Sequence, residues 1–164
     1  MFVECPDQTR CLHLAASAGN PRLETPERWA RTDGDFRRMP LAAARKVGQI
    51  ATTQDGLLIE DIEQDSAWIA RPEWARAEGI RSFAGHPLVF RGEVLGVLAV
   101  FCREALGPAS FEQLRAFAAQ AAVAIANARA FAEVARLREQ LELERDYLRE
   151  EVRSARAHGA IIGD

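Results

Sequence analysis

The side chains that most often carry chemistry, histidine and cysteine, are few in this 164-residue chain and stand far apart. Its three histidines are His13, His86 and His158, and no two of them have the His-x₃-His spacing that directs two ligands to one metal. Cys5 and Cys11 have five residues between them, more than the two to four that separate paired zinc ligands. The sequence therefore predicts no metal centre.

Nucleophilic catalysis also lacks its usual sequence patterns. The chain contains no Gly-x-Ser-x-Gly elbow and no Cys–His arrangement that sequence alone identifies. The third cysteine, Cys102, falls on a later predicted strand, and an odd, sparse set of cysteines argues against a disulfide framework. We therefore expect no enzymatic activity, and no residue pattern identifies a cofactor.

Composition limits the classes of partner. A hydrophobic fraction of 48% is enough for a core, and a net charge of -3 gives no general attraction to nucleic acid or to an anionic membrane. No apolar run approaches the roughly 20 residues that span a bilayer, and the first residues lack the basic start of a signal peptide. We expect one cytoplasmic domain of ordinary size with an appendage.

The elements that must position any site begin with a hairpin. Residues 82–90 and 94–102 form two apolar runs joined by a turn at Gly92. The second run is apolar at nearly every position, so we expect 94–101 to be an interior strand, antiparallel to the first and buried on both faces. Before the hairpin, residues 68–79 predict a short helix with Pro72 in its first turn and Gly79 at its end.

A very long helix follows, from about Ser110 to Arg156, with Ser110 and Gln113 arranged as a capping box. Its Ala-rich first half is expected to lie close on the sheet. About 45 helical residues span roughly 70 Å, more than a domain of this size can cover. The second half carries a partial heptad stripe that Glu144 interrupts. We expect this stripe to form a parallel homodimer; its residues are Val134, Leu137, Leu141, Leu148 and Val152.

Six segments in series resemble the GAF domains of bacterial signalling proteins. They are residues 12–19, 46–51, 58–61, 72–80, 83–88 and 94–98. The resemblance implies an α+β fold, with an antiparallel sheet of about six strands and helices on both faces, and it implies a small-molecule ligand. It covers residues 1–131. Such domains normally open with a helix that packs beside the final one, and this chain begins after it, which suggests a fragment or a misplaced start.

In that architecture the ligand cavity lies between the sheet and the loop–helix segments. Trp68 and Trp74 fall in those segments and could stack on a ligand or simply seal the core. Arg81 could pair with an anionic ligand or be solvated. Phe83 and His86 are three residues apart on a strand, so only one of them should line the cavity. Sequence patterns of the bilin-binding and cyclic-nucleotide-binding GAF domains are absent.

The end of the chain resembles a second pattern. Residues 144–152 followed by 161–164 are similar to the junction that precedes the AAA+ ATPase domain of enhancer-dependent (sigma-54) transcription activators. This resemblance implies a helical linker over 132–158 and the start of an output domain at 159–164. No Walker A loop or helix-turn-helix is present, so this fragment should not contact DNA. Two alternatives to a transcription activator remain. One is a GAF sensor of a two-component histidine kinase, and the other is a GAF-type methionine-sulfoxide reductase that uses cysteines.

Overall fold

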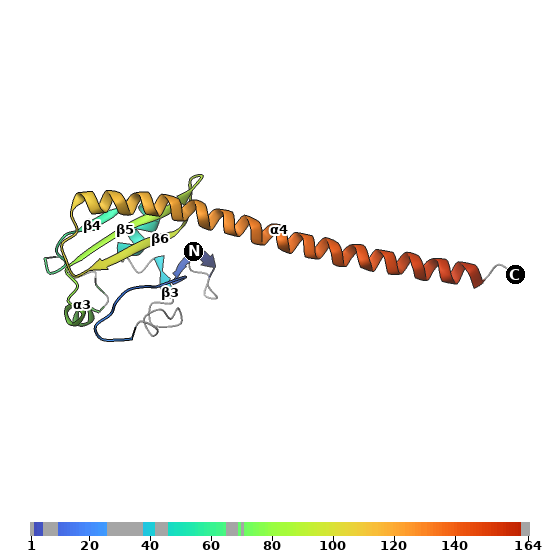
Figure 1. Ribbon diagram of the computed structural model, residues 1–164, viewed down its shortest axis with the longest axis horizontal. Helices are drawn as coiled ribbons and strands as arrows, with labels where there is room; N and C mark the ends of the chain where they lie inside the picture. The colour runs from blue at the N-terminus through green and yellow to red at the C-terminus, as the bar shows by residue number, and fades with distance from the viewer. Residues whose placement is uncertain are drawn as a thin grey trace. The chain divides into compact units, whose positions relative to one another are not determined.

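The computed structural model of the protein describes residues 2–4, 10–25, 38–41, 46–64, 69 and 71–161 (Figure 1). The elements follow in the order β1 (Phe2–Glu4), β2 (Arg10–His13), β3 (Arg38–Pro40), α2 (Lys46–Thr53), β4 (Leu57–Ile59), α3 (Pro72–Glu78), β5 (Ser82–Phe90), β6 (Glu93–Cys102) and α4 (Pro108–Ile161). All of the paired strands are antiparallel. The fold is of the α+β class, as the sequence predicts.

The strands of the described residues form two sheets of three, in the orders β1-β2-β3 and β4-β5-β6. The pairing of 82–90 with the second run is confirmed, but its predicted interior position is wrong, because β5 is central and β6 lies at the edge of its described sheet. The expectation of full burial is wrong too: Val94 and Leu95 are buried, but Phe101 is exposed. An apolar sequence indicates that other elements pack on both faces of a strand. It does not indicate how many neighbouring strands form hydrogen bonds with it.

The turn between β5 and β6 has the chemistry that the sequence predicts. Arg91 and Gly92 both have a positive φ, of 50° and 83°. Two consecutive residues with positive φ make a type I′ turn, whose twist matches that of the flanking strands. The strands close with Phe90 opposite Glu93, and the register shifts between Leu88 and Val89. This hairpin is the longest paired segment among the described strands.

One face of β5 is sealed by an apolar core. Phe83 packs there with Ile50 of α2, Ala75 of α3 and Ile62 of the loop after β4. The absence of a side chain at Gly85 permits the close approach of α2, because a Cβ there would lie 2.5 Å from Ile50 Cδ1. Residues 83 and 85 face the same side of a strand, so this side of β5 is the core side.

The first turns of α4 run along the sheet of β4, β5 and β6 (Figure 1). Ala118 and Ala122 are four residues apart, share one helix face and are buried, whereas Phe117 is exposed. Small side chains on that face let the helix approach the strands. The helix begins at Pro108, so the predicted capping role of Ser110 is wrong. Proline suits this first position because its missing N–H would have no partner there.

Helix α3 begins at Pro72 and ends before Gly79, whose φ of 70° is left-handed. The predicted roles of Pro72 at the start and Gly79 at the end of this helix are confirmed. The predicted helix start at residue 68 lies outside the described residues, as do 65–67 and 70. The last helical residue, Glu78, is buried. Its carboxylate accepts hydrogen bonds from the backbone N–H groups of Arg22 and Leu23, at 2.8 and 2.9 Å, and from Arg103 Nη2 at 2.9 Å.

Burial alone would raise the pKa of the Glu78 carboxyl, but its backbone donors and Arg103 more than offset that effect and hold the pKa below its usual value. Arg103 also donates from Nε to the Glu78 carbonyl and from Nη2 to the Asn20 carbonyl, at 2.8 and 2.9 Å. One satisfied ion pair therefore joins the loop before residue 25, α3 and the segment that follows β6.

The chain divides into two compact units, residues 1–124 and 125–164. The first holds both sheets, α2, α3 and the start of α4, and the second holds the remainder of α4. Every side chain described between residues 130 and 154 is exposed. Within the described part of the chain, no helix combines the length and the apolar character needed to cross a bilayer.

Candidate functional site

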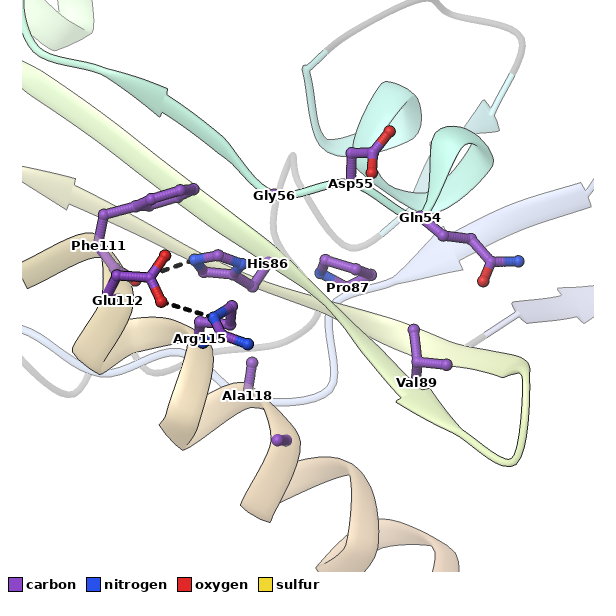
Figure 2. A pocket seen from close by; sticks show the side chains of 11 residues that line it. Gln54, Asp55, Gly56, His86, Pro87, Val89, Phe111, Glu112, Arg115 and Ala118 are labelled. Carbon is purple, nitrogen blue, oxygen red and sulfur yellow. Dashed lines mark hydrogen bonds and ion pairs between the residues drawn. The ribbon is translucent and has the colours of Figure 1, made fainter. Parts of the chain in front are cut away.

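A pocket of about 360 Å³ lies between β5 and the first turns of α4, within the first unit (Figure 2). Three segments that are distant in the sequence build it: the turn between α2 and β4, strand β5, and the start of α4. The lining residues are Gln54, Asp55, Gly56, His86, Pro87, Val89, Phe111, Glu112, Arg115, Ala118 and Ala119.

His86 is the polar side chain at the base of this pocket and is only 4% exposed. Its Nε2 lies 3.0 Å from the backbone carbonyl oxygen of Phe111. A carbonyl can only accept, so Nε2 carries the hydrogen and, in a neutral ring, Nδ1 is an acceptor. The ring also stacks on that of Phe111, with centroids 4.2 Å apart. No described residue donates a hydrogen bond to Nδ1, so this buried acceptor has no partner among the described residues.

Gly56 makes this arrangement possible. A Cβ at that position would lie 2.4 Å from His86 Nδ1, 2.5 Å from its Cε1 and 3.0 Å from Phe111 Cζ. Any other residue would therefore push the imidazole away from its place. The Asp55-Gly56 turn thus sets the position of the histidine as well as the start of β4.

Charged side chains form the rim of the pocket. Arg115 Nε donates to Glu112 Oε2 at 2.7 Å, and both side chains are more than half exposed. A solvated pair of this kind adds little to stability. Asp55 and Gln54 stand at the opposite rim (Figure 2). The rim therefore offers both signs of charge to a ligand, above a wall made of Phe111, Ala118 and Ala119.

The structure brings one of the five predicted ligand residues to this pocket. Phe83 lies in the core, and Trp74 packs against that core and meets Phe101 edge to face at 5.8 Å. Arg81 is exposed at the start of β5, and Trp68 lies outside the described residues. The argument from strand parity is confirmed, because Phe83 and His86 occupy opposite faces of β5.

Sequence reasoning missed the residues that hold His86 in place. The Asp55-Gly56 pair is recognisable as a turn, but nothing local connects it to a histidine thirty residues later. Phe111 and Arg115 are four apart and so share a helix face, a spacing that could have marked them as a pair. Their meeting with β5 depends on how α4 packs.

Cysteine chemistry receives little support from the structure. Burial and the nearby charge of Glu104 both raise the pKa of the Cys102 thiol, which keeps it in its weakly nucleophilic protonated form at neutral pH. Cys11 is disulfide-bonded, although the odd, sparse set of cysteines argues against a disulfide framework. Among the described residues, no cluster of three or more His, Cys, Asp or Glu side chains could hold a metal ion.

The scaffold is an α+β fold with a pocket between β5 and the start of α4. The sequence matches the GAF domain family over residues 7–125, well over half of its length. The chain therefore belongs to the GAF domain family, a general sensory module of signalling proteins. Among curated proteins, none matches the sequence.

Several solved structures are similar. The GAF domain of a phosphoenolpyruvate-protein phosphotransferase from Coxiella burnetii is 24% identical over 57% of this chain and 55% of that one, with a TM-score of 0.49. The corresponding domain from Acinetobacter is 23% identical over 58% and 55%, with a TM-score of 0.46. A methyl-accepting chemotaxis protein is 24% identical over 59% and 65%, with a TM-score of 0.46. The chain spans about half the length of the first two.

Proposed function

We propose that this GAF domain is the sensory region of a bacterial regulatory protein, and that it binds a small molecule in the pocket between β5 and α4. The observation that carries the proposal is the identity of the pocket wall. Phe111, Glu112, Arg115, Ala118 and Ala119 all belong to α4, and α4 continues to Ile161, well beyond the family match. A ligand in the pocket therefore touches the helix that leaves the domain.

The mechanism is a shift between two arrangements of the α4 start. Without ligand, His86 bonds and stacks on Phe111, which fixes the first turn of the helix on the sheet. A ligand that donates to His86 Nδ1 and contacts Arg115 adds these interactions only to the arrangement of α4 in which both groups can reach it. A ligand shifts such an equilibrium by as much as its affinities for the two states differ.

The downstream output proposed here is transcription activation by an AAA+ ATPase. Its support is the resemblance of residues 144–152 and 161–164 to the junction before such ATPases. The test is made on the full-length protein, by measuring ATP hydrolysis and histidine autophosphorylation side by side. Phosphate release without a phosphohistidine supports the activator, and autophosphorylation would instead assign the domain to a histidine kinase.

The pocket is tested with a matched pair of glycine substitutions. Gly56→Ala places a methyl group against the His86 ring, whereas Gly107→Ala meets open space. A panel of amino acids, nucleotides and small carboxylates is screened by the rise in melting temperature, because a ligand of the folded state stabilises it. A stabilising compound should lose its effect in the Gly56 variant and keep it in the Gly107 variant. Binding that survives both substitutions would place the ligand elsewhere.

A further inference from the structure

The pocket beside His86 is small and has an apolar wall. Its volume of about 360 Å³ lies near the low end of the roughly 300–1,000 Å³ that small-molecule sites occupy. The apolar lining residues are Pro87, Val89, Phe111, Ala118 and Ala119. This space favours a compact ligand that has an apolar part.

The charged side chains of the pocket restrict the net charge of that ligand. Asp55 and Glu112 are carboxylates, and Arg115 carries the positive charge of the lining. A ligand with several negative charges, such as a phosphate ester, would meet two carboxylates and one guanidinium, and like charges brought together oppose binding. The lining therefore favours a ligand without net charge that carries a single anionic group.

Arg115 has donors that remain available for this anionic group. Its Nε donates to Glu112 Oε2 at 2.7 Å, and its two terminal nitrogens donate to no described residue. A guanidinium pairs with a carboxylate through two parallel N–H···O bonds. Because the Arg115 side chain is more than half exposed, it can turn toward a carboxylate without losing a buried contact.

The buried nitrogen of His86 calls for a second kind of group in the ligand. His86 is 4% exposed, and its Nδ1 is an acceptor without a partner among the described residues. A carboxylate cannot donate, so a ligand with that group alone would leave Nδ1 unbonded. An ammonium group has three donors, and its positive charge also complements the carboxylate of Glu112.

We propose that the ligand is a free α-amino acid with an apolar side chain, an inference that rests on the proposed binding function of this pocket. Its carboxylate pairs with Arg115, its ammonium group donates to His86 Nδ1 and faces Glu112, and its side chain lies on the apolar wall (Figure 2). Glu112 and Arg115 are three residues apart on one helix, so their opposite charges are neighbours. The two charged groups of an α-amino acid are neighbours too, because one carbon carries both.

The ligand class is tested by calorimetric titration of the 164-residue chain with L-leucine and three analogues that each lack one group. 4-Methylpentanoate lacks the ammonium group, leucinamide lacks the carboxylate, and glycine lacks the apolar side chain. Each analogue should bind at least about tenfold more weakly than leucine, because hydrogen bonds to charged groups and apolar contacts each contribute that much to affinity. If 4-methylpentanoate binds as tightly as leucine, the ammonium group has no partner and the proposal is wrong.

The role of Arg115 is tested with a matched pair of substitutions. Arg136 forms the same kind of pair with the glutamate three residues before it, but it does not line the pocket. Arg115→Gln should weaken leucine binding at least about tenfold and leave leucinamide binding within about twofold, because leucinamide has no carboxylate. Arg136→Gln should change neither. If leucine binds equally to the two variants, Arg115 does not hold its carboxylate and the proposal is wrong.

Gly56→Ala separates failure of the ligand class from failure of the pocket. If leucine does not bind, but a compound of another class stabilises the wild type and loses its effect in the Gly56 variant, the amino-acid class is wrong and the pocket stands. If leucine binds equally to the wild type and the Gly56 variant, its site lies elsewhere, and both the ligand assignment and the pocket are wrong.

Discussion

The two faces of β5 meet very different surroundings. Phe83 points into an apolar core, packed with Ile50 and Ala75, and is fully buried. Three residues later, His86 points to the opposite face, where one ring nitrogen bonds the Phe111 carbonyl and the other has no partner among the described residues. One strand thus contributes to both a filled core and an open pocket.

The two faces of β5 therefore differ in role: one stabilises the fold, and the other can respond to a ligand. A close-packed apolar face has few alternatives of similar free energy, so it fixes the sheet. A buried polar atom beside a cavity can still gain a hydrogen bond, so a ligand can change the balance of states on that side. We expect substitutions on the core face to affect unfolding, and substitutions on the pocket face to affect binding.

The largest loss of stability should follow Phe83→Ala. Removing a buried phenylalanine ring leaves a cavity in the core, and we expect the free energy of unfolding to fall by about 3–5 kcal/mol. Urea denaturation measures this loss. Phe101→Ala is the control, because Phe101 contacts Phe83 at 5.1 Å between centroids but is exposed. If both variants lost the same free energy of unfolding, the buried Phe83 would be no more important to the core than the exposed Phe101.

Glu78→Gln should rank second. Glu78 is a buried polar group, but unlike His86 its acceptors are filled, so the substitution breaks bonds to charged and backbone donors and should remove about 2–3 kcal/mol. Because its pKa is lowered by folding, the wild type holds this contribution above the usual value of 4.5 and loses it as pH falls through the folded pKa. Unfolding measured from pH 7 to pH 3 should therefore be flatter for the variant. If the free energy of unfolding fell equally with pH in the wild type and the variant, Glu78 would not be the source of this pH dependence.

Gly56→Ala should have a smaller effect on stability. The added methyl group must displace the His86 ring and weaken its contact with Phe111, which we expect to remove about 1–3 kcal/mol. Gly107→Ala, at an open position, should stay within about 0.5 kcal/mol of the wild type. Thermal unfolding of the three proteins compares them. An unperturbed Gly56 variant would mean that the pocket face is looser than the contacts indicate.

His86→Gln should change stability least. The variant loses the stacked ring but keeps a donor group, so the free energy of unfolding should fall by only about 1 kcal/mol. Binding of a ligand that donates to Nδ1 should nevertheless weaken, because the acceptor at that position is gone. Calorimetric titration alongside urea denaturation separates the two effects. If the variant binds the ligand normally, His86 is not part of the binding site, and its Nδ1 atom does not distinguish the pocket face from the core face.

Local chemistry made several features predictable from the sequence. The turn at Gly92, the ends of α3 at Pro72 and Gly79, and the uninterrupted helix α4 depend on residues only a few positions apart. The opposite orientation of Phe83 and His86 follows from the two-residue period of a strand. Each of these rests on backbone preferences that act within one element.

Tertiary structure decided the rest, because it depends on segments that are distant in the chain. The edge position of β6 among the described strands reflects which strands pair, and its apolar sequence could not reveal that. The pocket exists because residues 54–56 and the start of α4 both pack against His86. Ser110 has the right type for a helix cap, but α4 begins two residues earlier, at Pro108. Residue type and spacing supplied the candidates, and packing between elements determined which of them meet.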